Sequence, residues 1–261
     1  MDIGPGTRVL ITGASRGIGR AFAQAFAATG AEVGLVARSA DTLEQVAAGL
    51  PGSGHRALAA DVADHASIEA ALNEFGDCDV LIANAGVANY GRFVDATLEE
   101  LDQMTRVNWL GCIYTIRAAL PRMIERGRGQ IVITSSGAGY RAFPWAAVYG
   151  GTKGAQRLFG EALRHELDGT GVSVTIVYPG EVESDLHAHE LARMPPWRKN
   201  DEEAPAAPLA ELVVKAVRED RASVHYPPFV RLLRIAHGLS PKLGDAFLRR
   251  LRGSTAAPRR G

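Results

Sequence analysis

Short apolar runs alternate along this chain with longer segments in which apolar residues recur at helical spacing. A short run rich in β-branched residues is typical of a buried strand, whereas apolar residues every three or four positions indicate an amphipathic helix. The predicted strands are Arg8–Thr12, Glu32–Ala37, His55–Ala59, Val80–Ala83, Gly129–Thr134, Val172–Val177 and Ser223–Tyr226. The predicted helices cover about residues 17–29, 40–50, 65–75, 97–126, 150–168 and 208–219.

The order of these segments predicts an α/β fold with parallel strands. Strands that alternate with helices pair in parallel, because each helix returns the chain to the edge where the next strand begins. The segments IVIT and VTIVY are apolar on both faces, as a sheet covered on both sides requires. With 261 residues, 46% of them hydrophobic, and no internal repeat, the chain is expected to fold around one large core.

A glycine-rich turn, TGASRGIG, joins the first predicted strand to the first predicted helix. Glycines in such a turn let the backbone approach a pyrophosphate, which the free N–H groups and the dipole of the helix N-terminus attract. In this context the turn predicts a dinucleotide site, although an ordinary tight turn is the alternative. The expected contacts are Gly13, Ser15, Arg16, Gly17, Ile18 and Gly19.

Two arginines favour NADP(H) over NAD(H). Sites for NAD place an acid near the end of the second strand to bind the ribose hydroxyls, whereas an arginine accommodates a 2′-phosphate. Here that strand ends in Ala37 and Arg38, and Arg16 lies in the glycine turn. Two guanidinium groups and the hydroxyl of Ser39 can hold one phosphate dianion. The alternative is that both arginines are solvated surface residues.

Asp61 and Val62 follow the third predicted strand. The Asp61 carboxylate can accept a hydrogen bond from an adenine amino group. Alternatively, it caps a helical segment that begins at Ala63. We expect both residues to contact the cofactor.

Several motifs occur together in a recognisable order. They are TGASRGIG, Asn84-Ala85-Gly86, Asn108, Ser136, Tyr149-x-x-x-Lys153 and Pro179-Gly180. In these spacings the chain resembles the short-chain dehydrogenase/reductases over about residues 7–226. The resemblance implies a single Rossmann-like domain over residues 1–228, with a doubly wound sheet of seven parallel strands flanked by helices. It also implies a nicotinamide cofactor and carbonyl/alcohol oxidoreduction by a Ser-Tyr-Lys-Asn tetrad.

Tyr149 and Lys153 are four residues apart on a helix, so their side chains share one face. A free phenol has a pKa near ~10, and lowering that pKa towards ~7 requires about 4 kcal/mol of preferential phenolate stabilisation. A nearby Lys153 ammonium can supply much of this stabilisation. Tyr149 is then expected to protonate the carbonyl oxygen in reduction and to accept the hydroxyl proton in oxidation.

Ser136 and Asn108 complete the implied tetrad. Ser136 ends the fifth strand and can hydrogen-bond the same substrate oxygen. Ser135 is the rival, but neighbouring strand residues point to opposite faces, and the family spacing selects Ser136. The resemblance implies that Asn108 holds a water linking Lys153 to solvent. The alternative is an ordinary polar residue in a helix.

The resemblance assigns further cofactor contacts to the ends of the later strands, where open α/β sheets bind ligands. The expected contacts are Asn84, Ala85 and Gly86 after the fourth strand, Pro179 and Gly180 at the end of the sixth, Val182 and Ser184 beside the nicotinamide carboxamide, and Tyr149 and Lys153 themselves. Ser184 stands where the family more often has threonine, but the hydroxyl is retained.

No metal site is expected. His187 and His189 are two positions apart, so they do not share a helical face, and no third ligand stands near them. Cys78 and Cys112 lack metal-binding spacing and are expected in the core. Residues 184–208, rich in Pro, His and charged side chains, are predicted to form a substrate lid.

The end of the chain is strongly basic. Residues 221–261 hold nine of the 29 basic residues and one acid, a charge of +8, and residues 1–220 carry −8. Residues 229–261 are predicted to form a basic amphipathic helical extension with an apolar stripe of Phe229, Leu232, Leu233 and Ala236. We favour packing beside the substrate site, with dimerisation and contact with an anionic membrane as alternatives. Nucleic-acid binding is not expected, because stacking aromatics and a reader motif are missing.

These features predict an NADP(H)-dependent oxidoreductase that interconverts a ketone or aldehyde and an alcohol. An apolar substrate, steroid-like, long-chain or lipid-related, is expected by analogy with relatives that carry similar tails. The alternatives are an alcohol dehydrogenase working mainly in the oxidative direction, and an NAD(P)-binding sensor or scaffold without turnover. The resemblance implies a homodimer or homotetramer formed through the helices at 97–126 and 150–168. A cytoplasmic location is expected, because no apolar run of 18 residues occurs and Met1–Gly6 is short and polar.

Overall fold

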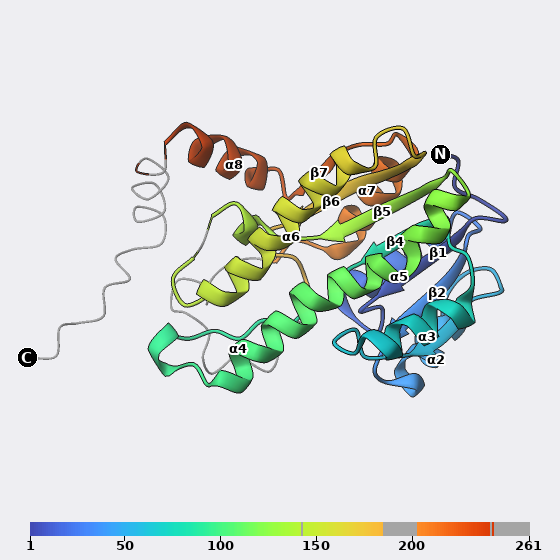
Figure 1. Ribbon diagram of the computed structural model, residues 1–261, viewed down its shortest axis with the longest axis horizontal. Helices are drawn as coiled ribbons and strands as arrows, with labels where there is room; N and C mark the ends of the chain where they lie inside the picture. The colour runs from blue at the N-terminus through green and yellow to red at the C-terminus, as the bar shows by residue number, and fades with distance from the viewer. Residues whose placement is uncertain (142, 185–202, 241, 243–261) are drawn as a thin grey trace, which may run out of the picture.

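Seven strands pair in parallel in the order β3-β2-β1-β4-β5-β6-β7 in this computed structural model, which describes residues 1–141, 143–184, 203–240 and 242 (Figure 1). The strands are β1 (Arg8–Thr12), β2 (Glu32–Ala37), β3 (Arg56–Ala59), β4 (Val80–Ala83), β5 (Gly129–Thr134), β6 (Val172–Pro179) and β7 (Ser223–Tyr226). The helices between them are α1 (Gly17–Ala27), α2 (Ala40–Ala48), α3 (His65–Phe75), α4 (Leu98–Met104), α5 (Gly111–Glu125), α6 (Ala147–Glu166) and α7 (Ala206–Arg218). The doubly wound, Rossmann-like sheet predicted from the sequence is therefore confirmed.

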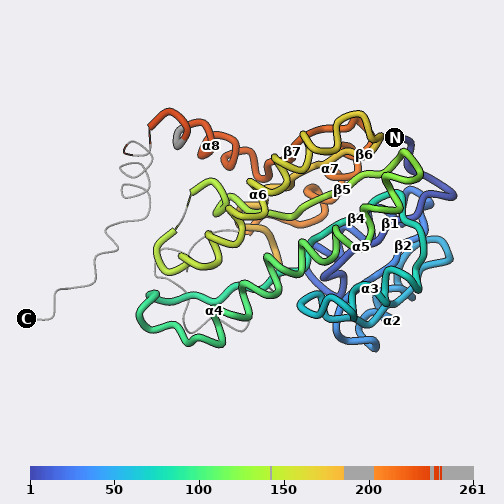
Figure 2. The backbone as a smooth tube through the Cα atoms, viewed as in Figure 1, coloured from blue at the N-terminus to red at the C-terminus, as the bar shows by residue number. Residues whose placement is uncertain are grey.

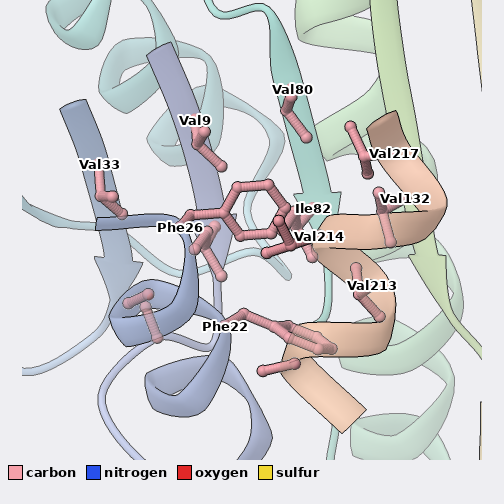
Figure 3. Packing of buried hydrophobic residues seen from close by; sticks show 14 of the residues in the cluster. Val9, Phe22, Phe26, Val33, Val80, Ile82, Val132, Val213, Val214 and Val217 are labelled. Atoms are coloured by element: carbon pink, nitrogen blue, oxygen red, sulfur yellow. The ribbon is translucent and has the colours of Figure 1, made fainter. Parts of the chain in front are cut away.

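Alternate residues of each strand enter two separate cores. In β1, Val9 and Ile11 face the core beneath α1, α2 and α7, whereas Leu10 faces the core beneath α3, α5 and α6. Phe22 and Phe26 of α1 point between the sheet and α7 (Figure 3). A strand that buries both of its faces must be apolar at successive positions, which explains the continuous apolar runs in the sequence.

The strand order reverses between β1 and β4. β1 pairs with β2 on one side and with β4 on the other, and the connection after β3 crosses the sheet to reach β4. Side chains bridge this junction: Asn84 Nδ2 donates to Thr12 O at 3.1 Å, and the amides of Asn84 and Ala85 donate to Thr12 Oγ1. Loops on both sides diverge at such a switch point and leave a crevice at the carboxyl ends of the strands.

The predicted helix at 97–126 is not one regular α-helix. α4 and α5 are joined by η2 (Thr105–Leu110), a π-helical segment that contains Asn108. A π-segment inserts an extra residue into a helical turn and is frequent at functional sites. Residue periodicity alone does not reveal it, because the apolar spacing continues through the insertion.

Most predicted boundaries agree with the structure within two residues, but the start of α6 and one alternative for a helix cap need correction. α6 begins at Ala147 instead of residue 150, and its N-cap Ala146 makes no side-chain cap that the sequence could signal. α3 begins at His65 with Asp64 as its N-cap, so Asp61 is not a helix cap. β6 continues through Tyr178 to Pro179, two residues beyond the prediction. Two short 3₁₀ turns, η1 (Phe93–Asp95) and η3 (Gly137–Gly139), were not anticipated.

A final helix, α8 (Phe229–Leu239), follows β7 and lies beyond the carboxyl ends of the strands, at the same end of the molecule as α4 (Figure 2). It accounts for the first part of the predicted extension, and residues 243–261 lie outside the described residues. Among the described residues, no helix is both long enough and apolar enough to cross a membrane.

Candidate functional site

A cavity of about 550 Å³ opens at the carboxyl ends of the strands. Every residue predicted from the sequence to belong to the site, except Asn108, lines this cavity. These lining residues are Gly13, Ser15, Arg16, Gly17, Ile18, Gly19, Arg38, Ser39, Asp61, Val62, Asn84, Ala85, Gly86, Ser136, Tyr149, Lys153, Pro179, Gly180, Val182 and Ser184. Segments up to 171 positions apart in the sequence, from Gly13 to Ser184, therefore meet in one crevice.

The glycine turn after β1 fits a pyrophosphate. Gly13 has a φ of +69°, and a Cβ atom there would lie 2.8 Å from Ala85 Cα, so a larger residue would collide with the loop after β4. At the start of α1 the N-cap Arg16 gives no side-chain cap to the helix amides. Uncapped N–H groups at a helix N-terminus bind phosphate oxygens, and the dipole favours the negative charge.

The end of β2 presents cations and hydroxyls to the cavity. Arg16 and Arg38 line it there, together with Ser39 and Thr42. Ser39 caps α2: its Oγ accepts a hydrogen bond from Thr42 N at 3.4 Å and lies 2.9 Å from Thr42 Oγ1. Thr42 escaped sequence reasoning, although a residue in the first turn of a helix four positions after Arg38 is a reasonable candidate.

Asp61 is the one acid among the described residues that line the cavity. Its carboxylate accepts a hydrogen bond from Ala63 N at 2.9 Å, and its own amide donates to Ser67 Oγ at 3.1 Å. These bonds hold the loop after β3 in place, at the end of the strand that neighbours β2. The acid that typically binds the ribose hydroxyls of NAD is therefore replaced at the end of β2 by Ala37 and Arg38.

Tyr149 and Lys153 lie one helical turn apart on α6 and face the same cavity. Lys153 Nζ lies 5.9 Å from the centre of the Tyr149 ring and donates a hydrogen bond to Thr134 O at 2.8 Å. Burial lowers the pKa of the Lys153 ammonium from its ordinary value of 10.5 to about 8. At neutral pH the amine is still mostly charged, in a setting where little water screens its effect on the phenol.

The hydroxyl groups of the two serines after β5 make different contacts. Ser135 is buried, and its Oγ donates to Lys153 O at 2.8 Å, so that hydroxyl holds α6 against the strand. Ser136 is partly exposed and accepts from Ala138 N at 3.1 Å, with a long contact of 3.4 Å from its Oγ to Pro179 O. Both residues line the cavity, but the Ser136 hydroxyl is the more weakly engaged with the protein.

Asn108 does not line the cavity but lies fully buried behind Lys153. Its Oδ1 accepts from Val87 N at 2.7 Å, and its Nδ2 donates to Val87 O at 2.9 Å and to Thr152 Oγ1 at 3.1 Å. The side chain thus joins the loop after β4 to the turn of α6 that carries Lys153. Asn108 is therefore a buried, hydrogen-bonded residue of η2, and its part in the reaction stays a prediction.

Gln156 is a buried residue of this site that sequence reasoning missed. Its Nε2 donates to the main-chain carbonyl of Asn108 at 2.8 Å. It lies three positions after Lys153 on α6 and is fully buried. A polar residue on the apolar face of a helix was the available signal. Gln156 does not line the cavity; besides Thr42, the lining residues that sequence reasoning did not name are Ala60, Val87, Val107 and Thr134.

α8 supports the end of the cavity that Pro179 and Gly180 form. Val230 is fully buried, and a Cβ atom at Gly180 would lie 3.0 Å from Val230 Cγ2 and 3.3 Å from Phe229 Cζ. Tyr140, which follows η3, hydrogen-bonds His225 Nε2 through its OH at 3.0 Å and lies beneath the Arg234 guanidinium of α8. The favoured prediction, packing of the extension beside the site, agrees with these contacts.

The remaining sequence predictions concern metals and the lid. Cys78 and Cys112 are buried, and burial raises the pKa of each thiol to about 12, so neither is a thiolate at neutral pH. Within the described ranges, no cluster of three or more His, Cys, Asp or Glu residues could hold a metal ion. His187, His189 and the central part of the predicted lid lie outside the described residues. At the two ends of that part, Val182 and Ala204 form a parallel bridge.

The sequence is similar to those of known oxidoreductases. A family model described as short chain dehydrogenase matches residues 7–194. A mouse (Mus musculus) protein named dehydrogenase/reductase SDR family member 7B is 32% identical over 237 residues, which are 85% of this chain and 73% of that protein. In another curated relative, 37% identical over 187 residues, the match spans only 15% of the relative's own length.

Solved structures resemble the whole fold and contain two kinds of nicotinamide cofactor. The 3-ketoacyl-(acyl-carrier-protein) reductase of Brucella melitensis, complexed with NADH, has a TM-score of 0.76 and 28% identity and covers 85% of this chain and 97% of its own. The alcohol dehydrogenase of Thermococcus sibiricus, complexed with 5-hydroxy-NADP, has a TM-score of 0.72 and 30% identity and covers 84% of this chain and 95% of its own.

Proposed function

Because this chain belongs to the short-chain dehydrogenase/reductase family, we propose that it is an NADP(H)-dependent enzyme that interconverts an apolar ketone or aldehyde and the corresponding alcohol. The observation that carries this proposal is the convergence of Tyr149, Lys153 and Ser136 on one cavity whose other end holds a phosphate-binding turn. A sensor or scaffold needs the cofactor turn but not a phenol beside a buried amine. The arrangement therefore favours turnover.

Each polar side chain of the site has a defined part in the proposed reaction. Tyr149 donates a proton to the carbonyl oxygen in reduction and accepts the hydroxyl proton in oxidation. The Lys153 ammonium stabilises the phenolate, and the Ser136 hydroxyl hydrogen-bonds the substrate oxygen as negative charge develops on it. A bound nicotinamide supplies or accepts the hydride. Asn108 acts through Lys153, because it holds α6 against the loop after β4 without reaching the cavity.

The preference for NADP(H) rests on the end of β2. Arg16 and Arg38 both line the cavity, and Thr42 and Ser39 place hydroxyl groups beside them. A 2′-phosphate dianion there would gain charge-assisted hydrogen bonds, whereas a ribose diol would find no carboxylate at Ala37 or Arg38 to accept its protons. Both features favour the phosphorylated cofactor.

The apolar substrate is supported by the surroundings of Tyr149. This residue belongs to a small apolar cluster, separate from the two cores of the sheet, with Ala88, Tyr90, Met104 and Ala146. A substrate whose carbonyl reaches the phenol would lie against this cluster. Burial of apolar groups of the substrate against this cluster would favour binding, because it removes apolar surface from water.

The test is turnover of NADPH and NADH with a panel of aldehydes, ketosteroids, long-chain 3-ketones and quinones, repeated with Tyr149→Phe. We expect turnover with NADPH on an apolar ketone. The variant should lose roughly 10²- to 10⁴-fold in kcat, because the proton donor is removed, while binding NADPH as tightly as the wild type. Tyr114→Phe, on α5 and away from the cavity, is the matched control.

Two outcomes would count against the proposal. Tight NADPH binding without turnover across the panel would favour a sensor. Near-normal activity of Tyr149→Phe would exclude this phenol as the proton donor, provided that Tyr114→Phe is equally active.

We also propose that the enzyme is a homodimer or homotetramer assembled through α5 and α6. Leu158 of α6 is 58% exposed and Ile124 of α5 is 42% exposed, so both helices present apolar side chains on their outer surfaces. Members of this family are typically oligomeric, and a shared helix face is an economical contact between identical subunits.

A further inference from the structure

α8 has three distinct faces. Val230 and Leu233 point inward and are buried, which attaches the helix to Gly137 and Gly180. Phe229, Leu232 and Ile235 are each at least half exposed, and at a spacing of three residues they form an outward apolar stripe. The stripe predicted from the sequence is therefore split, because Leu233 turns to the protein and Leu232 does not, while Phe229 rests its ring tip near Gly180 and stays half exposed.

The third face is cationic. Arg231 and Arg234 are exposed on α8, and Lys242 follows the helix, also exposed. The segment FVRLLRIAHGL contains no acidic residue, and residues 221–261 together hold nine basic residues and one acid. An exposed apolar stripe flanked by arginines matches the chemistry of a surface that is both apolar and anionic.

A contact between two copies fits this helix less well. An α-helix of eleven residues is about 16 Å long, and one face of it offers far less than the area of about 800 Å² that each partner contributes to a stable interface. Two copies would also bring like charges together at Arg231 and Arg234. The rest of the chain after α8 is itself basic, so it would repel these arginines in the same way.

We propose that the outward face of α8 binds an anionic lipid surface, with Leu232, Ile235 and Leu239 inserted among the acyl chains and Arg231 at the headgroups. Leu239 is 80% exposed and extends the stripe by one turn. A second exposed apolar group consists of Phe93 and Val94 of η1 and Leu98 at the start of α4. α4 and α8 lie at the same end of the molecule, α8 at the top and α4 at the bottom of the view (Figure 1).

This orientation places the catalytic cavity next to the membrane. The inner face of α8 packs on Gly180, which lines the cavity, so lipid contact on the outer face lies one helix diameter from the site. An apolar carbonyl compound dissolved in the bilayer would then reach the site without crossing much water. This last step rests on the proposed function, whereas the binding of the surface does not.

The experiment is co-sedimentation of the full chain with vesicles of phosphatidylcholine alone or of phosphatidylcholine with phosphatidylglycerol. We expect binding to the anionic vesicles only, weakening as salt is added. Leu232→Glu should lower the ratio of bound to free protein more than about tenfold, since it removes a leucine side chain that would be buried among the acyl chains. Arg231→Ser should lower that ratio about fivefold.

Ala48→Glu is the matched control, because Ala48 is an exposed apolar residue of α2, away from α8, α4 and the proposed oligomer contact (Figure 1). It should bind like the wild type, and circular dichroism should show all variants folded. No binding of the wild type, or equal binding to neutral vesicles, would overturn the proposal. So would a Leu232→Glu variant that binds normally, or one that converts an oligomer to monomers in sedimentation, since the face would then be a contact between copies.

Discussion

Arg38 follows β2 directly and lines the cavity, and its neighbour Ala37 carries no charge. If this guanidinium binds a 2′-phosphate, Arg38→Asp removes one charge-assisted contact and adds repulsion. Such contacts are worth about 1.5–3 kcal/mol each, so the ratio of kcat/KM for NADPH to that for NADH should fall roughly 10- to 100-fold. Steady-state kinetics with both cofactors measures this ratio.

Arg20→Asp is the matched control, since Arg20 is an exposed arginine of α1 that does not line the cavity. It should leave the cofactor ratio unchanged. If Arg38→Asp also leaves the ratio unchanged, Arg38 does not read the phosphate, and the preference for NADP(H) loses its main support.

Most site residues could be found from the sequence because they follow the ends of parallel strands. Gly13, Arg38 and Asn84 come directly after β1, β2 and β4, and these carboxyl ends meet at one edge. Thr42 was missed because it lies within α2 and reaches the cavity only through the direction in which that helix leaves the sheet. The proposed catalytic roles and the cofactor preference stay predictions.

Helix α6 carries the proposed acid, and two side-chain amides join it to the π-segment η2: that of Asn108, which donates to Thr152 Oγ1, and that of Gln156. Gln156 Nε2 donates to Asn108 O, whose backbone lies in the irregular turn. A π-turn loses the regular i to i−4 ladder, so a side-chain donor stabilises a carbonyl there more than in a regular helix. We therefore treat Gln156 as a positioning residue.

Gln156→Leu should leave that buried carbonyl without this donor. The expected loss of stability is about 1–3 kcal/mol, measured as the free energy of unfolding in urea. Because Lys153 would be less well held, kcat should fall and its pH profile should shift, while the KM for NADPH changes little.

Gln24→Leu, an exposed position on α1, should change the unfolding free energy by less than about 0.5 kcal/mol. A Gln156→Leu variant that loses stability but keeps the wild-type pH profile of kcat would make Gln156 a purely structural residue.

The elements themselves followed from periodicity, but their irregular parts did not. The apolar runs located every strand of the sheet within two residues, because both faces of each central strand are buried. The π-segment and the start of α6 at Ala147 have no sequence signal of this kind. Both the π-segment and the start of α6 depend on how α6 packs against the helices that η2 joins.

The folded protein buries an ammonium group, that of Lys153, beneath the cavity. Lys153 is only 4% exposed, and burial lowers its pKa to about 8, against 10.5 in its ordinary state. Between these two values the unfolded chain binds more protons at this residue than the native protein does. The contribution of Lys153 to the free energy of unfolding therefore rises as pH increases from about 8 to 10.5, and the full penalty of the buried charge is present below pH 8.

Lys153→Met removes this titration. Without cofactor, the free energy of unfolding of the wild type minus that of the variant should rise by on the order of 3 kcal/mol across this range. The lost hydrogen bond to Thr134 O shifts the difference by the same amount at every pH, so the slope is the informative quantity. Urea unfolding at several pH values measures it. A difference that is flat with pH would mean that Lys153 is not desolvated.

The sequence by itself determined the α/β fold, the glycine turn and most of the residues that line the cavity, because strand periodicity and the loops after parallel strands are local features. The tertiary structure decided what depends on distant segments meeting. Asn108 joins the loop after β4 to α6 behind Lys153, because a buried side-chain amide forms hydrogen bonds with the groups that pack beside it. The apolar stripe of α8 was divided between Gly180 and solvent, because periodicity counts apolar positions but only packing chooses which of them are covered.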